Sequence, residues 1–206
     1  QFVRQQQGWV ALYRRKLNET ESWTWWIDAA AVYLASIYPL AFWMTSLPRN
    51  FNWFVANDFF AMPALVETVL FPIYVLALAA YFAKSVFLYK TKGFLNSGKD
   101  IVVVTTAVCW YVGIVVFNSD YAFTVTNVII HGVPYFALIW FYAKKRRESA
   151  GRVYRTLSNH WIIFLATLWG FAYVEELFWT RGVWHDRTWL FGANWDWAGW
   201  QMWLVP

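Results

Sequence analysis

Five apolar stretches dominate the sequence, and each is long enough, or nearly so, to cross a membrane as a helix. Crossing about 30 Å of hydrocarbon takes roughly 20 helical residues at a rise of 1.5 Å each. Soluble domains usually have about a quarter charged residues, whereas this chain has 14% charged and 60% hydrophobic residues. We therefore predict membrane-spanning helices near residues 23–46, 62–83, 101–117, 123–143 and 160–179.

A polar interruption at Asn118, Ser119 and Asp120 separates the third and fourth stretches. A tight turn between two antiparallel helices explains it better than one uninterrupted helix. The apolar residues that begin near Ala198 predict a truncated sixth span. The sequence thus predicts an all-α polytopic transmembrane helical bundle with five complete spans. No repeat or linker divides the chain, so we expect residues 1–206 to form a single integral membrane domain.

Lysine and arginine residues fall almost entirely into alternate connecting segments of this topology. If the N-terminus is cytoplasmic, all 17 of these cations except Arg49, Arg181 and Arg187 lie on the cytoplasmic side. Short cytoplasmic loops concentrate Lys and Arg, so the alternation supports both the five spans and this orientation. We expect an integral protein of the bacterial inner membrane with its N-terminus in the cytoplasm.

The first segment, residues 1–22, is polar and basic and lacks the apolar core of a secretory signal peptide. We predict it to be a cytoplasmic, amphipathic lead-in to the first span. Asp28 lies about one turn inside that span, where it could pair with Arg14, Arg15 or Lys16. The net charge is +5, but the basic clusters lie beside membrane spans. Anionic lipid headgroups are therefore the expected partners, and nucleic acid is not.

The fourth span has polar residues near its middle, in the stretch TVTNVIIHGVPYFALIW (residues 124–140). Asn127 and His131 are four residues apart, so their side chains share one helix face and Asn127 can orient His131. Polar groups at this depth normally face the bundle interior, because facing lipid is costly. Pro134 lacks an N–H, so we expect it to loosen the helix and free a backbone carbonyl for the same site.

Further acidic and imidazole side chains reach the outer half of the predicted bundle together with His131. They are Glu67 in the second span, Glu175 and Glu176 near the end of the fifth, and His185 just beyond it. One interpretation is internal hydrogen bonding that only fixes helix packing. A second is a metal or acid–base site, with His131 and Glu175 as catalytic groups and all five residues as ligands of a transition metal, namely Fe, Zn, Mn or Cu. Direct ligation of a cofactor such as heme is a third.

Tryptophans crowd the last part of the chain. Because Trp prefers the membrane interface, we predict that residues 180–197 lie along the outer interface as an aromatic cap over the polar cluster. An aromatic belt is the favoured interpretation. The alternative is an aromatic-lined cleft, in which Trp184 and Trp189, together with Asn127, contact a bound apolar cofactor. The tryptophans concerned are Trp179, Trp184, Trp189, Trp195, Trp197, Trp200 and Trp203.

Several function classes are excluded by what the sequence lacks. Three histidines cannot form the clustered histidine boxes of membrane desaturases, and no P-loop, GxSxG or HExxH motif occurs. The single cysteine, Cys109, excludes redox chemistry that needs two thiols within the chain. A transporter is disfavoured because no paired broken helices are visible.

The leading functional prediction is an integral membrane protein with a carboxylate–histidine site in the outer half of the bundle. This site, with or without a metal, would act on or bind a lipid-soluble molecule such as an isoprenoid, quinone, carotenoid or acyl chain. The alternative is a non-catalytic accessory subunit of a larger membrane complex, which contacts lipid, pigment or neighbouring subunits. Enzymatic activity stays open on the sequence alone.

Overall fold

A computed structural model describes residues 2–50, 59–146, 151–185 and 187–195. Every regular element in these ranges is a helix. Five helical segments are long and apolar enough to cross a membrane, so the predicted all-α polytopic bundle with five complete spans is confirmed. The residues near Ala198 that would begin a sixth span lie outside the described ranges. The five segments are Ser22–Thr45, Ala64–Lys92, Ser97–Val116, Asp120–Arg146 and Trp161–Trp184.

Contacts within the chain divide it into two compact units, Gln1–Tyr135 and Phe136–Pro206, and each is described by itself. The prediction of one membrane domain over residues 1–206 therefore stays a prediction. Of the predicted site residues, the first unit contains Glu67, Asn127 and His131. Its helices are α1 (Phe2–Lys16), α2 (Ser22–Thr45), α3 (Ala64–Lys92), α4 (Ser97–Trp110) with a π-helical continuation (Tyr111–Val116), α5 (Asp120–Asn127), a second π-helical segment (Val128–Gly132), and the start of α6 (Val133–Arg146).

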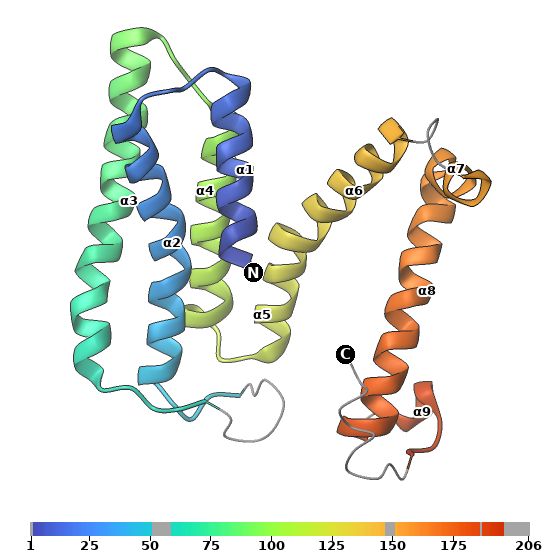
Figure 1. The fold of residues 1–206 in the computed structure, drawn as a ribbon. Coiled ribbons are helices and arrows are strands. Elements are labelled where there is room, and N and C mark those ends of the chain that lie inside the picture. The colour runs from blue at the N-terminus through green and yellow to red at the C-terminus, as the bar shows by residue number, and fades with distance from the viewer. Residues whose placement is uncertain (1, 51–58, 147–150, 186, 196–206) are drawn as a thin grey trace. The chain divides into compact units, whose positions relative to one another are not determined.

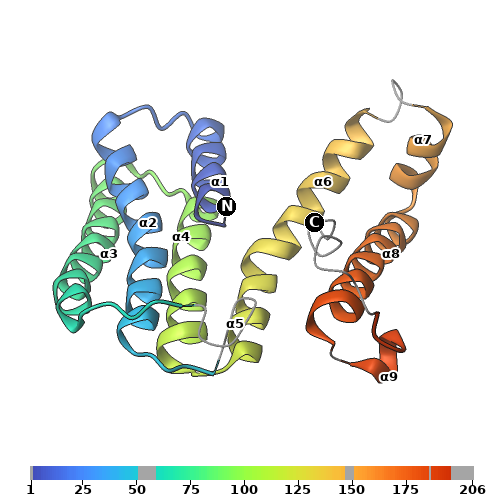
Figure 2. The ribbon, with the colours of Figure 1, turned by 60° about the horizontal axis from the view of Figure 1, so that its bottom comes forward.

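Helices α1 to α4 lie side by side, as Figures 1 and 2 show. Helix α2 packs mainly on α3 and α4, and α1 packs on α4 and α2. The small residues Ala31 and Ala35 of α2 are fully buried in this core, where they allow close approach of the neighbouring helices. The rings of Tyr38 and Tyr74 stack at 4.8 Å between α2 and α3. The predicted polar turn is present, since Asn118 and Ser119 separate the π-helical continuation of α4 from α5.

Helix α3 is longer than its apolar stretch predicts. It ends at Lys92, nine residues after the predicted boundary at residue 83. The added turns hold their place because Lys84 and Leu88 are buried against the bundle. Gly93 then adopts a left-handed conformation with φ of 61°, which ends the helix in the manner of a glycine C-cap.

Helix α1 belongs to the bundle of the first unit. Gln6, Val10 and Arg14 recur every four residues on one face and are buried. The absence of a side chain at Gly98 of α4 makes room for the ring of Tyr13, which a Cβ atom at position 98 would overlap. The polar side chains of this face have buried partners, so α1 packs into the bundle. The prediction that residues 1–22 form a cytoplasmic, amphipathic lead-in stays a prediction.

The second unit contains the remainder of α6, α7 (Arg152–Asn159), α8 (Trp161–Trp179) with a π-helical continuation (Thr180–Trp184), and α9 (Thr188–Phe191). Helix α9 folds back on α8, since the ring of Phe191 stacks on that of Tyr173 at 5.3 Å. The backbone N–H of Trp195 donates to the carbonyl of Arg181 at 2.9 Å. The described part of the predicted aromatic cap, up to residue 195, therefore forms a short helical return at the end of the fifth span.

Candidate functional site

The fourth span changes its helical geometry beside His131. The α-helical hydrogen bonding of α5 gives way to a π-helical segment over Val128–Gly132 before α6 begins. Short π-helical segments inside α-helices are rare and occur frequently at functional sites. The segment begins directly after Asn127 and contains His131, so the two polar residues singled out by the sequence lie at this irregularity.

Pro134 contributes to the same irregularity through its missing N–H. In a regular α-helix, the carbonyl of Ile130 would accept a hydrogen bond from residue 134, which a proline cannot donate. The side chain of Gln6 in α1 donates to this carbonyl instead, with Nε2 at 2.9 Å. The neighbouring Gln5 donates to the carbonyl of His131 at 3.2 Å. These two hydrogen bonds therefore join α1 to the fourth span.

The imidazole of His131 lies among aromatic rings. Its ring meets the ring of Phe2 edge-on, with centroids 4.3 Å apart, and lies parallel to that of Tyr135 at 6.0 Å. Its Nδ1 atom is buried, and no described residue forms a hydrogen bond with it. A buried polar atom without a partner costs about 1–3 kcal/mol. This nitrogen is therefore a candidate contact for a bound molecule.

A cavity of about 350 Å³ lies beside His131. Its volume lies within the range of small-molecule pockets, which are mostly apolar with a few polar groups that fix orientation. Here the polar groups come from Asn127, which is only 9% exposed, and from His131 and Thr124. All of the lining residues belong to the first unit: Phe2, Phe123, Thr124, Asn127, Val128, His131 and Gly132.

Glu67 lies apart from His131 in the contacts of the first unit. It occupies the first turn of α3 and accepts a hydrogen bond from the hydroxyl of Thr45 at the end of α2, at 2.9 Å. Among the described residues, no hydrogen bond or ion pair connects Glu67 with His131. The carboxylate of Glu67 therefore has a partner that fixes the α2–α3 end, and its proposed role as a ligand has no support from these contacts.

The other predicted site residues lie in the second unit. Glu176 forms an ion pair with Arg187 at 3.2 Å, whereas Glu175 is exposed. His185 is exposed at the end of the π-helical continuation, and its backbone has a left-handed conformation with φ of 59°. Trp184 stacks on Trp179 at 5.3 Å, and Trp189 is 82% exposed on α9.

The predicted metal centre has no counterpart among the described residues of either single unit. Among the residues that the structure describes, no group of three or more His, Cys, Asp or Glu side chains could hold a metal ion. A site shared by His131 with Glu175, Glu176 and His185 would need ligands from both units, so it stays a prediction. The first unit alone offers one imidazole and one amide at the cavity.

A second polar cluster of the first unit, which sequence reasoning largely missed, consists of five buried charged side chains. We call it the charge network: Arg14, Glu19, Asp28, Lys84 and Lys99. The fully buried carboxylate of Asp28 lies at its centre. It pairs with Arg14 Nη1 at 2.7 Å, with Lys99 Nζ at 3.0 Å, and with Lys84 Nζ. Glu19 pairs with Lys99 at 2.6 Å and with Arg14 at 2.9 Å.

The donors of Arg14 are almost all used inside this network. Nη1 also donates to the hydroxyl of Thr24 at 2.8 Å, and Nη2 donates to the carbonyls of Glu19 and Glu21 at 3.1 and 2.9 Å. Burial of the Glu19 carboxyl by itself raises its pKa. The hydrogen bond from Lys99 and the nearby positive charges of Lys99, Arg14 and Lys84 outweigh that effect, so the pKa of Glu19 is lower than its ordinary value.

The pairing of Asp28 with Arg14 was among the sequence predictions and is confirmed. The participation of Lys84 and Lys99 was not expected, because both were assigned to a cytoplasmic connection between spans. The sequence did contain a signal for these partners, because an acidic residue inside a span, such as Asp28, requires buried partners. The longer α3 places Lys84 at the depth of Asp28, which the predicted boundary at residue 83 concealed.

Comparisons with known proteins identify no relative of this chain. No protein-family model matches the chain, and neither a curated protein nor a solved structure matches it. The two polar regions of the first unit and the membrane-spanning character of the helices are therefore the features that bear on function.

Proposed function

We propose that this chain is an integral membrane protein that binds a lipid-soluble molecule with a polar end in the cavity beside His131. The observation behind this proposal is the buried Nδ1 atom of His131, which has no partner among the described residues at a cavity lined mainly by apolar groups. A ligand hydroxyl could donate to this nitrogen, or a ligand carbonyl could accept from it in the tautomer that has the proton on Nδ1, and the amide of Asn127 could bond the same polar end. Isoprenoids, quinones and oxygenated carotenoids combine such an end with an apolar body.

The hydrogen bond of Gln6 indicates that specific contacts hold the walls of the cavity in place. Hydrogen bonding of Gln6 to the Ile130 carbonyl holds α1 against the π-helical segment. This places Phe2, which contributes a wall of the cavity, against the ring of His131. The aromatic wall, the amide and the imidazole are thus positioned by pairing between α1 and the fourth span. Pre-organised sites lose less entropy when a ligand binds.

Extraction of the purified chain with organic solvent tests this proposal. The full chain, isolated in mild detergent, is expected to release a stoichiometric apolar molecule that mass spectrometry detects. The His131→Leu variant should retain about tenfold less, which corresponds to the loss of one hydrogen bond of about 1.4 kcal/mol. Glu67→Gln is the matched control, because its carboxylate bonds Thr45 and does not line the cavity. Extracts without such a molecule, or equal retention in His131→Leu, would refute the proposal.

Metal binding is the second part of the predicted function, and no contact of the described residues supports it. His131, Glu175, Glu176 and His185 contain suitable ligand types for Fe, Zn, Mn or Cu. Elemental analysis of the purified chain should then find stoichiometric transition metal that is lost in His131→Ala. If the chain is metal-free and still binds the apolar molecule, metal binding is refuted and ligand binding in the cavity stands.

A role as accessory subunit is favoured by one feature of the second unit. None of the described residues of α8 is buried, and Trp169 and Phe171 are 73% and 70% exposed. Large exposed aromatic side chains suit contacts with lipid, pigment or a neighbouring subunit. Native mass measurement after mild extraction distinguishes this role, because a subunit is expected to remain in a larger complex.

The orientation in the membrane is also a proposal. The end of the first unit where α1 and α3 finish and α4 begins has Arg14, Arg15, Lys16, Lys90, Lys92 and Lys99. Cytoplasmic ends concentrate such residues, so we place this end, with the α1–α2 loop, in the cytoplasm of a bacterial cell. Labelling of a cysteine introduced into this loop by a membrane-impermeant reagent tests the assignment.

A further inference from the structure

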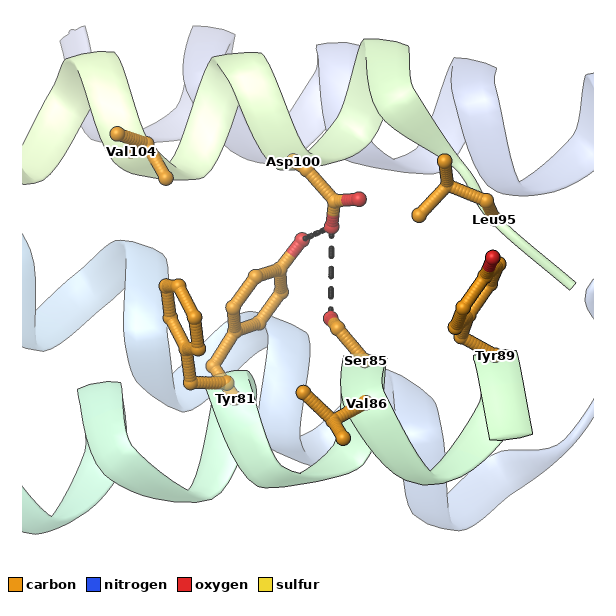
Figure 3. A pocket seen from close by; sticks show the side chains of 8 residues that line it. Tyr81, Ser85, Val86, Tyr89, Leu95, Asp100 and Val104 are labelled. Atoms are coloured by element: carbon orange, nitrogen blue, oxygen red, sulfur yellow. Dashed lines mark hydrogen bonds between the residues drawn. The ribbon is translucent and has the colours of Figure 1, made fainter. Parts of the chain in front are cut away.

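A second cavity of the first unit lies between the last turns of α3 and the first turns of α4. Its volume is about 280 Å³, and its lining is almost entirely apolar or aromatic. Figure 3 shows Tyr81, Ser85, Val86 and Tyr89 reaching it from α3, and Asp100 and Val104 from α4. The cavity is separate from that beside His131, since the two share no lining residue.

Asp100 is the only charged residue that lines this cavity among those described. Its Oδ1 atom accepts hydrogen bonds from the hydroxyls of Tyr81 at 2.6 Å and Ser85 at 3.4 Å. Figure 3 shows both bonds on one oxygen, with the second oxygen directed away from them. In the described part of the chain, no lysine or arginine pairs with Asp100, because Lys84 and Lys99 bond Asp28. Among the described residues, the second oxygen of Asp100 thus has no hydrogen-bond partner and the carboxylate has no ion-pair partner.

The rings around this carboxylate suit a cation. Tyr81, Tyr89 and Phe82 line the cavity, and aromatic faces attract ammonium groups. The ammonium of Lys84 already lies over the ring of Tyr81, 4.1 Å from its centroid, so Tyr89 and Phe82 are the rings left for a ligand. A carboxylate oxygen with aromatic walls is a combination that recognises an ammonium by charge, by hydrogen bonding and by cation–π attraction. An anionic or neutral headgroup would lack the charge attraction and the cation–π contact, even where its hydroxyls can donate to the carboxylate.

The remaining lining residues suit an acyl chain. Phe82 and Leu95 are 66% and 55% exposed, and Val86 and Val104 are also exposed, so the cavity opens on the outside of the helices, where lipid lies. Tyr89 is three residues before the end of α3, or about 5 Å along the helix axis. The cavity thus lies at the depth where lipid headgroups meet the hydrocarbon.

From this juxtaposition we propose that the α3–α4 cavity binds a phospholipid with a primary ammonium headgroup, of the phosphatidylethanolamine type. The ammonium donates to the second oxygen of Asp100 and lies against the ring of Tyr89. The acyl chains follow Val86 and Val104 toward the membrane interior. A primary ammonium fits better than a quaternary one, because only the primary group has N–H donors for the carboxylate oxygen.

Native mass spectrometry of the full chain tests this assignment. The detergent-solubilised chain is incubated with an equimolar mixture of phosphatidylethanolamine, phosphatidylcholine and phosphatidylglycerol that have identical acyl chains. The wild-type chain should bind phosphatidylethanolamine about tenfold better than phosphatidylglycerol, with phosphatidylcholine between them. Equal binding of all three lipids would overturn the proposal. Equal binding of the ethanolamine and choline lipids alone would overturn the assignment of a primary ammonium.

The Asp100→Asn variant keeps the size of the side chain and an acceptor for Tyr81 and Ser85, and it removes the charge. Its preference for the ethanolamine lipid should fall to about one. Asp120→Asn is the matched control, because it makes the same change at a carboxylate that bonds Thr124 in α5. Retained preference in Asp100→Asn would refute the role of this carboxylate.

A second variant covers the case in which Asp100→Asn does not fold. Val104→Trp fills the cavity and leaves the carboxylate in place, so it should also abolish the preference. Preference that persists in a folded Val104→Trp chain would contradict this location. His131→Leu should leave the lipid ratio unchanged, which separates a failure of this site from a failure of the cavity beside His131.

Discussion

The first unit has two buried polar regions, and they differ in how completely their groups are paired. In the charge network, Asp28 receives three cations and Arg14 bonds four acceptors in addition to Asp28. Beside the fourth span, the Nδ1 atom of His131 is buried with no hydrogen-bond partner in the described residues. Complete pairing is what a structural element needs, because an unpaired buried charge is very costly. An unpaired group at a cavity is instead open to a ligand.

The difference also concerns which helices each region joins. The charge network connects α1, the α1–α2 loop, α2, α3 and α4 at one end of the unit. The side-chain hydrogen bonds beside His131, from Gln5 and Gln6, join α1 to the fourth span. We therefore expect substitutions in the network to lower the free energy of unfolding, whereas substitutions of His131 should change ligand retention.

The largest effect is expected from Asp28→Asn. Removal of the central negative charge leaves Arg14, Lys84 and Lys99 with only Glu19 to balance them inside the bundle. Loss of one partner of a buried ion pair costs about 3–5 kcal/mol, so thermal unfolding in detergent should shift strongly or the folded chain should not accumulate. The control is Glu21→Gln, which removes an exposed pair with Lys92 and should leave the transition unchanged. An unaltered transition in Asp28→Asn would remove the distinction between the two regions.

A smaller effect is expected from Gln6→Leu, because the leucine side chain has nearly the same volume as that of glutamine but lacks the amide. The carbonyl of Ile130 then loses its side-chain donor and cannot recover one from Pro134. An unsatisfied buried acceptor costs about 1–3 kcal/mol, and chemical denaturation should report a loss in that range. Because Phe2 lines the cavity beside His131, ligand retention should fall as well. Stability and retention equal to those of the wild type would show that this contact does not position α1.

The smallest effect is expected from the pH dependence of stability that Glu19 contributes. Its pKa is lowered in the folded chain by Lys99 and Arg14 against an ordinary value of 4.5. The unfolded chain therefore binds a proton first as pH falls. The stabilisation is present above about pH 4.5 and is lost as pH falls through the lower pKa of the folded state. Unfolding curves between pH 6 and pH 3 should show this loss, and Glu19→Gln should reduce it. The same slope in both chains would exclude Glu19 as its source.

The spans were predictable because length and apolar content are local properties. The stretch 23–46 lies within one residue of α2 at either end, and the polar turn after residue 117 was expected from Asn118 and Ser119. The end of α3 was not predictable from hydropathy, because Lys84 is polar in sequence and buried only through its contact with Asp28. For the same reason, the packing of α1 into the bundle was not part of the sequence prediction, because Gln6 and Arg14 are polar in sequence and buried only through their partners.

The candidate sites were predictable only in part. The sequence singled out Asn127 and His131 through their spacing, and the structure places both at one cavity. It also grouped Glu67 with them by depth, but depth does not specify which face of a helix meets which neighbour. Glu67 bonds Thr45 instead. Asp100 attracted no prediction, because an acidic residue at the start of a helix is common and its lack of an ion-pair partner appears only in three dimensions.

The sequence by itself determined that this chain forms membrane-spanning helices, because the transfer of long apolar stretches into hydrocarbon depends on composition and length alone. Tertiary structure decided which polar groups are paired and which are not. Pairing depends on the rotation and close approach of helices from distant parts of the chain. Gly98 next to Tyr13 and the α3 extension beyond residue 83 set these positions, and neither can be deduced from local pattern.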